Sequence, residues 1–161
     1  MPISAIDICQ SVENIWMSLL GLEVQPSPQV ASLNGGKHFL TSCVHLTGGW
    51  DGAVTLECSM PLARQIASIM FSMEPEAASM EEIRDALGEM VSITGGNLKA
   101  ILAGDCHLSL PTVAEGLDYR LAVPRSRVVA RVGFECQSHP LLVTLLERDA
   151  TGREVPGHNL R

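Results

Sequence analysis

The chain has 161 residues, of which 46% are hydrophobic and 18% are charged, and its formal net charge is −7. The length suits one domain, and the low aromatic content of 4% predicts an aliphatic core. The negative charge argues against nucleic acid or an anionic membrane surface as a partner, because no basic stripe is available to neutralise phosphates. The sequence contains no run of about 18 apolar residues, so no transmembrane helix is expected.

The cysteines and histidines are typical of an intracellular protein without a metal site. The five cysteines form no CxxC pair, and residues 1–20 carry acidic side chains and lack the basic region of a signal peptide. An odd number of cysteines fits a reducing compartment, so we expect a cytoplasmic protein. The five histidines show no HxH or HExxH spacing, and we expect no metal ligands in this chain.

Residues 3–20 predict an amphipathic helix, because their apolar side chains recur at helical spacing. Ser4 or Asp7 is placed to cap this helix, and Gly21 is placed to end it. Residues 25–36 contain two prolines and two glycines and therefore predict a loop.

A β-hairpin is predicted next. Residues 38–46 and 53–58 have the composition of strands, and in the second strand apolar side chains alternate with Thr55 and Glu57. The six residues between the strands, Thr-Gly-Gly-Trp-Asp-Gly, favour a turn. We therefore expect the two strands to pair.

Two helices are predicted to follow the hairpin. Ser59 before Pro61 matches an N-cap followed by proline in the first turn, and the helix is expected over residues 61–73. Ser79, with Glu82 three residues later, matches a capping box, and this second helix is expected to run to about residue 102.

The remaining apolar segments predict strands, separated by glycine and proline. They cover residues 108–110, 119–123, 128–136 and 141–146. The polar tail 149–161 is expected to be frayed, which leaves residues 1–148 as a single domain. The order of a helix, a hairpin, helices and further strands predicts an α+β domain with long helices laid on a sheet.

The long helix predicted from Ser79 carries a polar stripe. It consists of residues at offsets of four, seven, eleven and fourteen, which keep to one side of a helix: Asp85, Glu89, Ser92, Gly96 and Lys99. A solvent-exposed helix face is the simpler explanation of this spacing. Periodicity by itself does not indicate a phosphatase.

The segment 85–97, Asp-Ala-Leu-Gly-Glu-Met-Val-Ser-Ile-Thr-Gly-Gly-Asn, resembles the signature helix of the CheC/CheX/FliY family. That signature is Asp or Ser, three residues, Glu, two residues and Asn. The hairpin over residues 44–56, with its Thr-Gly-Gly turn, and the Leu-Pro-Thr-Val-Ala-Glu-Gly segment at 110–116 also resemble CheX sequences. The three matches occur in the order of the family, and the resemblance covers roughly residues 5–148.

The resemblance implies a CheC/CheX-like α+β fold, with a mixed, mostly antiparallel sheet of about six strands packed by long helices. Members of this family dephosphorylate the aspartyl phosphate of CheY-type response regulators. A phosphorylated CheY-like regulator is therefore the expected partner. The Mg²⁺ ion belongs to that partner, so no cofactor is expected in this chain. A homodimer is expected, because CheX-like length and one motif rather than two resemble the dimeric members.

The resemblance also implies roles for the polar stripe. Glu89 matches the motif Glu, which pairs with a lysine of the regulator, and Asp85 matches the first motif position. With Asp85, the residues Gly96 and Lys99 are expected to contact the partner. The motif Asn, which orients the attacking water, is replaced by Ser92, and Asn97 lies about 140° further around the helix.

Three functions therefore remain open. The first is a phosphatase in which Glu89 docks and the position of Ser92 orients the attacking water. The second is a non-catalytic module on the same fold that binds a response regulator, because Ser92 replaces the family Asn. The third is a structural homologue in another signalling system.

Overall fold

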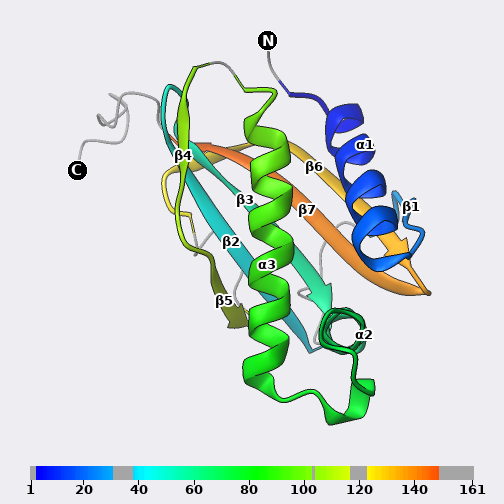
Figure 1. Cartoon of the computed structure of the whole chain (residues 1–161). Coiled ribbons are helices and arrows are strands. Elements are labelled where there is room, and N and C mark those ends of the chain that lie inside the picture. Colours follow the sequence, from blue (N-terminus) through cyan, green and yellow to red (C-terminus); the bar gives the residue numbers. More distant parts are fainter. Residues whose placement is uncertain (1–2, 31–37, 103, 117–122, 149–161) are drawn as a thin grey trace.

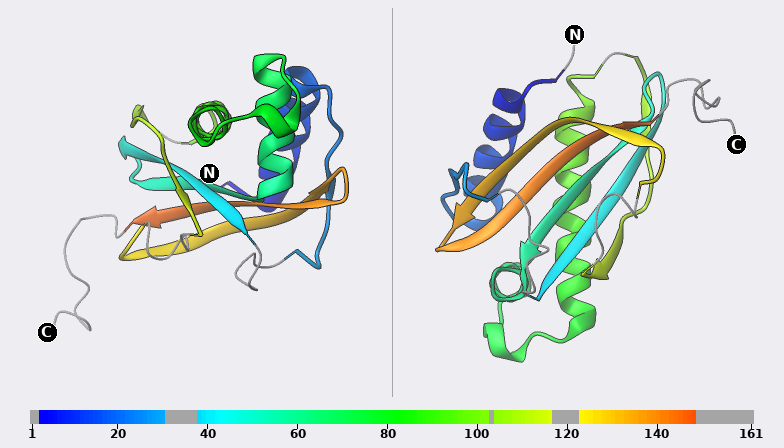
Figure 2. Two further views of the ribbon diagram at one scale, coloured as in Figure 1. Left: turned by 90° about the horizontal axis from the view of Figure 1, so that it is seen from below. Right: turned by 180° about the vertical axis from the view of Figure 1, so that it is seen from behind.

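The computed structural model describes residues 3–30, 38–102, 104–116 and 123–148, which fold around one β-sheet (Figure 1). In chain order the elements are α1 (Ala5–Ile15), the π-helical turn η1 (Trp16–Leu20), β1 (Gln25–Pro26), β2 (Phe39–Gly48), β3 (Gly52–Ser59), α2 (Met60–Phe71), the 3-10 turn η2 (Pro75–Ala77), α3 (Met80–Lys99), β4 (Cys106–Leu108), β5 (Thr112–Glu115), β6 (Ser126–Cys136) and β7 (His139–Arg148). Figure 2 shows that the α-helices lie on one side of the sheet. The α+β class predicted from the sequence is confirmed.

All strand pairs of the described sheet are antiparallel. The strand order is β1-β6-β7-β3-β2-β4, and β5 also pairs with β2. On its outer side β2 therefore has two partners, β4 beside residues 46–48 and β5 beside residues 40–43. The family resemblance implies about six, mostly antiparallel strands, and the described sheet has seven.

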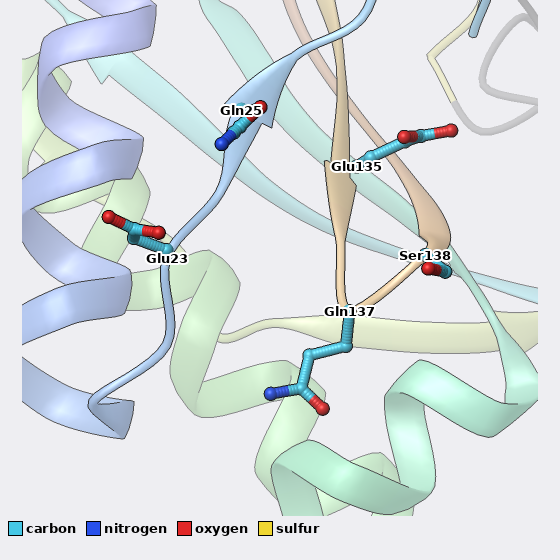
Figure 3. A pocket seen from close by; sticks show the side chains of 5 residues that line it. All are labelled: Glu23, Gln25, Glu135, Gln137 and Ser138. Carbon is cyan, nitrogen blue, oxygen red and sulfur yellow. The ribbon is translucent and has the colours of Figure 1, made fainter.

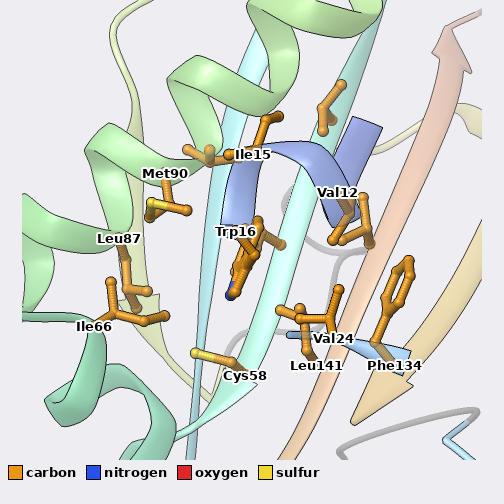
Figure 4. Close-up of a cluster of buried hydrophobic side chains, with 14 of the residues drawn as sticks. Val12, Ile15, Trp16, Val24, Cys58, Ile66, Leu87, Met90, Phe134 and Leu141 are labelled. Atoms are coloured by element: carbon orange, nitrogen blue, oxygen red, sulfur yellow. The ribbon is translucent and has the colours of Figure 1, made fainter. Parts of the chain in front are cut away.

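The core lies between the helices and the face of the sheet that they cover (Figure 4). Trp16 of η1 is fully buried there, near side chains of α3 and of β3. Residues two positions apart on the central strands face this core, which is the period expected of a strand with one face on the core, and all but the buried Ser42 of β2 are apolar. On β2 and β3 the apolar residues are Leu40, Val44, Leu46, Val54, Leu56 and Cys58.

The predicted helix starts are confirmed. The Ser4 hydroxyl accepts from the Asp7 N–H, and the Asp7 carboxylate accepts from the Ser4 N–H, so α1 begins with a capping box. The same reciprocal pair joins Ser79 and Glu82 at α3. The hydroxyl of Ser59 caps α2.

Two predictions for the N-terminal region are corrected. The helix predicted over residues 3–20 keeps α-helical winding only to Ile15, and then widens into η1 before Gly21 ends it in the left-handed conformation (φ 68°). This wider turn buries Trp16 and Leu20 together. The loop predicted over 25–36 contains β1, because Gln25 and Pro26 pair with β6, a strand more than a hundred residues away.

Further corrections concern the C-terminal half. α3 ends at Lys99 rather than near residue 102, because the N–H groups of Ile101 and Leu102 bond to carbonyls three residues back, in a tighter turn.

The strand predicted over 108–110 lies two residues earlier, as β4, and β5 was not predicted. The strand predicted over 119–123 falls mostly outside the described residues, and Val123 is not in a strand. The tail 149–161 also lies outside them. None of the helices described is long and apolar enough to cross a bilayer.

Candidate functional site

A groove of about 540 Å³ lies between α3 and the chain segment that joins β4 to β5 and enters β5. In Figure 1 this segment descends beside α3 along the outer edge of the sheet. One wall is the exposed side of α3, and the other is largely apolar. The lining residues are Arg84, Asp85, Gly88, Glu89 and Ser92 on α3, and Leu110, Pro111 and Val113 opposite them.

The polar side chains of the α3 wall are open to solvent and to a partner. Arg84, Asp85 and Glu89 are exposed, and Ser92 is half-buried. Within the described part of the chain, the four side chains make no hydrogen bond or ion pair. Thr94, two residues after Ser92, instead donates its hydroxyl to the carbonyl of Met90 at 2.7 Å. The donors and acceptors of the α3 wall are therefore available for intermolecular contacts.

The glycines of α3 set how closely it approaches the sheet and the opposite wall. A Cβ atom at Gly88 would lie 3.2 Å from Cγ of Pro111, so α3 and Pro111 are in tight contact at the bottom of the groove. A Cβ atom at Gly95 would lie 2.8 Å from Cγ2 of Val44 on β2, which leaves no room for a side chain. At Gly96 no atom lies within 4 Å of such a Cβ. Gly88 and Gly95 are therefore required for close packing.

The structure brings three of the predicted site residues into one groove and leaves two outside it. Asp85, Glu89 and Ser92 line it together, whereas Gly96 and Lys99 lie on later turns of α3 and do not. The helix continues without a break through Gly95 and Gly96, so Asn97 does not lie on the polar stripe. Sequence analysis missed Arg84 and Gly88 as site residues. It also missed the wall of Leu110, Pro111 and Val113, for which the resemblance to the Pro-Thr-Val segment was the only signal.

The chemistry of the groove is limited to charge and hydrogen bonding. Among the described residues that line it there is no cysteine and no histidine. Two of the buried cysteines are also poor nucleophiles: burial raises the pKa of the Cys43 thiol to about 11 and raises that of Cys58 as well. In the described residues no group of three His, Cys, Asp or Glu side chains is placed to hold a metal ion. This arrangement suits the docking and orientation of reactants better than covalent catalysis.

A second cavity of about 530 Å³ lies at the other edge of the sheet (Figure 3). It is formed by the segment around β1 and the turn between β6 and β7, and it contains two carboxylates, Glu23 and Glu135. None of the residues predicted for the site lines it. Its remaining described lining residues are the uncharged Gln25, Gln137 and Ser138.

The fold is shared with solved CheX structures. The chain matches CheX from Vibrio vulnificus with a TM-score of 0.71 at 20% identity, covering 88% of this chain and 95% of that one. For CheX from Desulfovibrio desulfuricans the TM-score is 0.68 at 16% identity, with 89% and 98% covered. For the CheX–CheY–BeF3–Mg²⁺ complex from Borrelia burgdorferi it is 0.67 at 17% identity, with 89% and 97% covered. No curated protein matches the sequence.

The sequence itself matches the family profile described as chemotaxis phosphatase CheX over residues 40–135. This range is more than half of the chain and contains the whole of α3 and both walls of the groove. The resemblance stated from the sequence is thereby confirmed. The chain belongs to the CheX family of chemotaxis phosphatases.

Proposed function

We propose that this protein is a cytoplasmic phosphatase that hydrolyses the aspartyl phosphate of a CheY-type response regulator. The observation that supports it is the position of Glu89 and Ser92, three residues apart in one open groove, in a chain of the CheX family. Neither side chain has a hydrogen-bond or ion-pair partner in the described structure, so both are available to a docking protein. The CheX structure from Borrelia burgdorferi, which shares this fold, was determined with CheY, BeF3 and Mg²⁺.

The reaction asks little of the phosphatase beyond positioning. A water oxygen attacks the phosphorus in line, the bond from phosphorus to the aspartyl oxygen breaks, and the products are the regulator carboxylate and inorganic phosphate. The water loses its proton to the phosphate or to solvent. The leaving group is already good, and in this proposal the Mg²⁺ ion is held by the regulator. What remains for this chain is to hold the regulator and to orient the water.

In this proposal Glu89 binds the regulator and Ser92 orients the attacking water. The Glu89 carboxylate pairs with a lysine of the regulator in a charge-assisted hydrogen bond. The Ser92 hydroxyl, which can both donate and accept, holds the attacking water. Asp85 adds negative charge one turn from Glu89, while Gly96 and Lys99 contact the regulator beyond the end of the groove.

A non-catalytic regulator-binding module is the second candidate, and Ser92 is the observation that favours it. A serine side chain has two fewer heavy atoms than the carboxamide of the family motif, so it reaches less far toward a phosphoryl group of the partner. In that case Glu89 and Asp85 still dock the regulator, but no group orients the water. Both candidates predict that the protein binds the regulator, and only the phosphatase predicts that it hydrolyses the aspartyl phosphate.

The deciding experiment measures the lifetime of the aspartyl phosphate on receiver domains with and without this protein. A phosphatase shortens the lifetime, because below saturation it increases the decay rate of the aspartyl phosphate in proportion to its own concentration. An unchanged lifetime at saturating protein, with binding shown separately, leaves the binding module. Because binding and hydrolysis are measured independently, each candidate has its own outcome.

We also propose that the protein forms a homodimer through a sheet edge. Among the described strands, β1 pairs with β6 only at Phe134 and Glu135, and residues 126–130 of β6 pair with no described strand on that side. An unpaired edge strand presents free N–H and C=O groups to a second copy. Light scattering tests this: a monomer mass at high protein concentration contradicts the proposal.

A further inference from the structure

Leu110 is the most exposed of the large apolar residues described, with 87% of its surface accessible. It lies in the connection between β4 and β5, at the rim of the groove on α3. Exposed leucines are common one at a time on protein surfaces. Leu110 differs from such residues in how firmly its backbone is held and in what lies beside it.

Both neighbours of Leu110 are anchored. The Ser109 N–H donates to the carbonyl of His45 at 2.9 Å, and its hydroxyl accepts from the His45 N–H at 2.9 Å. The same hydroxyl donates to the carbonyl of Leu110 at 2.9 Å. On the other side Pro111 packs on Gly88, where an added Cβ would be 3.2 Å away. Because the backbone is already fixed, covering Leu110 costs little backbone freedom, and only the rotamers of its side chain have to be ordered.

The groove beside Leu110 has a distinct chemical pattern. Leu110, Pro111 and Val113 present an apolar wall, and across from them the two carboxylates of Asp85 and Glu89 outnumber the single cation of Arg84. Both carboxylates are without ion pairs in the described structure. A complementary partner therefore carries a cation next to an apolar side chain, so that one surface satisfies both walls.

We propose that Leu110 is a docking residue for the receiver domain, and that it selects receivers with an apolar side chain beside the lysine that Glu89 engages. This inference rests on the proposed function for the identity of the partner. Leu110 contributes to affinity rather than to chemistry, since a leucine side chain neither orients water nor carries charge. Its apolar contact and the ion pair of Glu89 form next to each other on the same partner surface, which excludes water from both.

The test measures binding of CheY-type receiver domains from the source organism, each loaded with beryllofluoride and Mg²⁺ as a stable analogue of the phosphorylated state. Leu110→Asp is expected to weaken binding roughly tenfold or more, and Leu110→Ala less, whereas Leu110→Met keeps the affinity close to that of the parent. The matched control is Leu19→Asp, at a leucine of η1 that is 48% exposed and does not line the groove. Circular dichroism confirms that each variant is folded.

The outcomes separate this inference from the phosphatase proposal. If the parent binds a receiver and Leu110→Asp binds it equally well, the role of Leu110 is refuted and the phosphatase proposal stands. If the parent binds without shortening the phosphate lifetime, hydrolysis is refuted, and the Leu110 variants still decide the docking role. If no receiver binds the parent, both are refuted. Where hydrolysis occurs, Leu110→Asp raises KM and leaves kcat unchanged.

Discussion

Gly88 on α3 lies against Pro111 in the opposite wall of the groove, so closely that a Cβ atom at position 88 would stand 3.2 Å from Cγ of Pro111 and 3.9 Å from Cγ2 of Val113. The two residues are 23 positions apart in the sequence. Their contact fixes the distance between the polar wall with Glu89 and the apolar wall with Leu110. The absence of a side chain at position 88 therefore shapes the groove as well as the helix.

Gly88→Val is expected to widen the groove. Branched methyl groups at this position meet Pro111 and Val113, and overpacking of this kind costs about 1–3 kcal/mol, of which the better helix propensity of valine recovers only a few tenths. We expect a lower free energy of unfolding and weaker binding of the receiver. Chemical denaturation and a binding titration measure both. A variant with undiminished affinity and stability shows that the contact with Pro111 does not shape the site.

The two adjacent glycines of α3 provide a matched pair for stability. Gly96→Ala is expected to raise the free energy of unfolding by about 0.8–1 kcal/mol, because alanine has the better helix propensity and nothing lies within 4 Å of the new Cβ. Gly95→Ala is expected to lower it, because the new Cβ lies 2.8 Å from Cγ2 of Val44 and 3.2 Å from Cδ1 of Leu108.

Val44→Ala provides the control for the Gly95 prediction, because it removes the methyl group that the new Cβ meets. In a double-mutant cycle the two substitutions are expected to be less harmful together than the sum of their single effects. Urea unfolding of the four proteins measures this. If Gly95→Ala and Gly96→Ala shift the midpoint in the same direction, close packing of α3 on β2 is not the reason for Gly95.

Stability is expected to depend on pH through His45. Burial and the neighbouring Arg148, whose Nη2 lies 3.2 Å from Nδ1 of the ring, lower the pKa of His45 below its ordinary value of 6.5. Protonation is therefore easier in the unfolded chain, so the unfolded state binds more protons as the pH falls below 6.5. The contribution of His45 is fully present above that pH and is lost as the pH falls toward the lowered pKa.

His45→Gln keeps a polar side chain and removes this titration. The variant is expected to show a flatter loss of unfolding free energy between about pH 7 and pH 5 than the parent does. Denaturation at several pH values measures the two slopes. Equal slopes for the parent and His45→Gln contradict the assignment.

The features predicted from the sequence are those whose signals are local. The capping box of Ser79 and Glu82 fixes the start of α3, and the i, i+4 relation of Asp85 and Glu89 places both carboxylates on one side of it. β5 was missed, because Thr112–Glu115 is a short edge strand without alternating burial and depends on pairing with β2. The apolar wall of the groove was missed for the same reason: its distance from α3 is set by Gly88 and Pro111, a contact between distant parts of the chain.

Ser92→Asn is expected to accelerate hydrolysis, because the carboxamide restores the reach of the family motif to the attacking water. One added hydrogen bond in the transition state to a water beside the charged phosphoryl group is worth about 1.5–3 kcal/mol, which corresponds to roughly ten- to a hundredfold in kcat. The Kd for the beryllofluoride-loaded receiver is expected to stay unchanged, since docking depends on Glu89. Single-turnover decay of the phosphorylated receiver measures the rate.

Two further variants locate the effect. Glu89→Gln keeps the shape of the side chain and removes its charge, so the affinity for the receiver is expected to fall by roughly ten- to a hundredfold, through loss of a charge-assisted hydrogen bond. Asn97→Ser, at an exposed position of α3, is expected to leave both affinity and rate unchanged, because the helix continues without a break and position 97 does not line the groove. A rate that falls with Asn97→Ser and does not respond to Ser92→Asn assigns the water-orienting role to Asn97 instead.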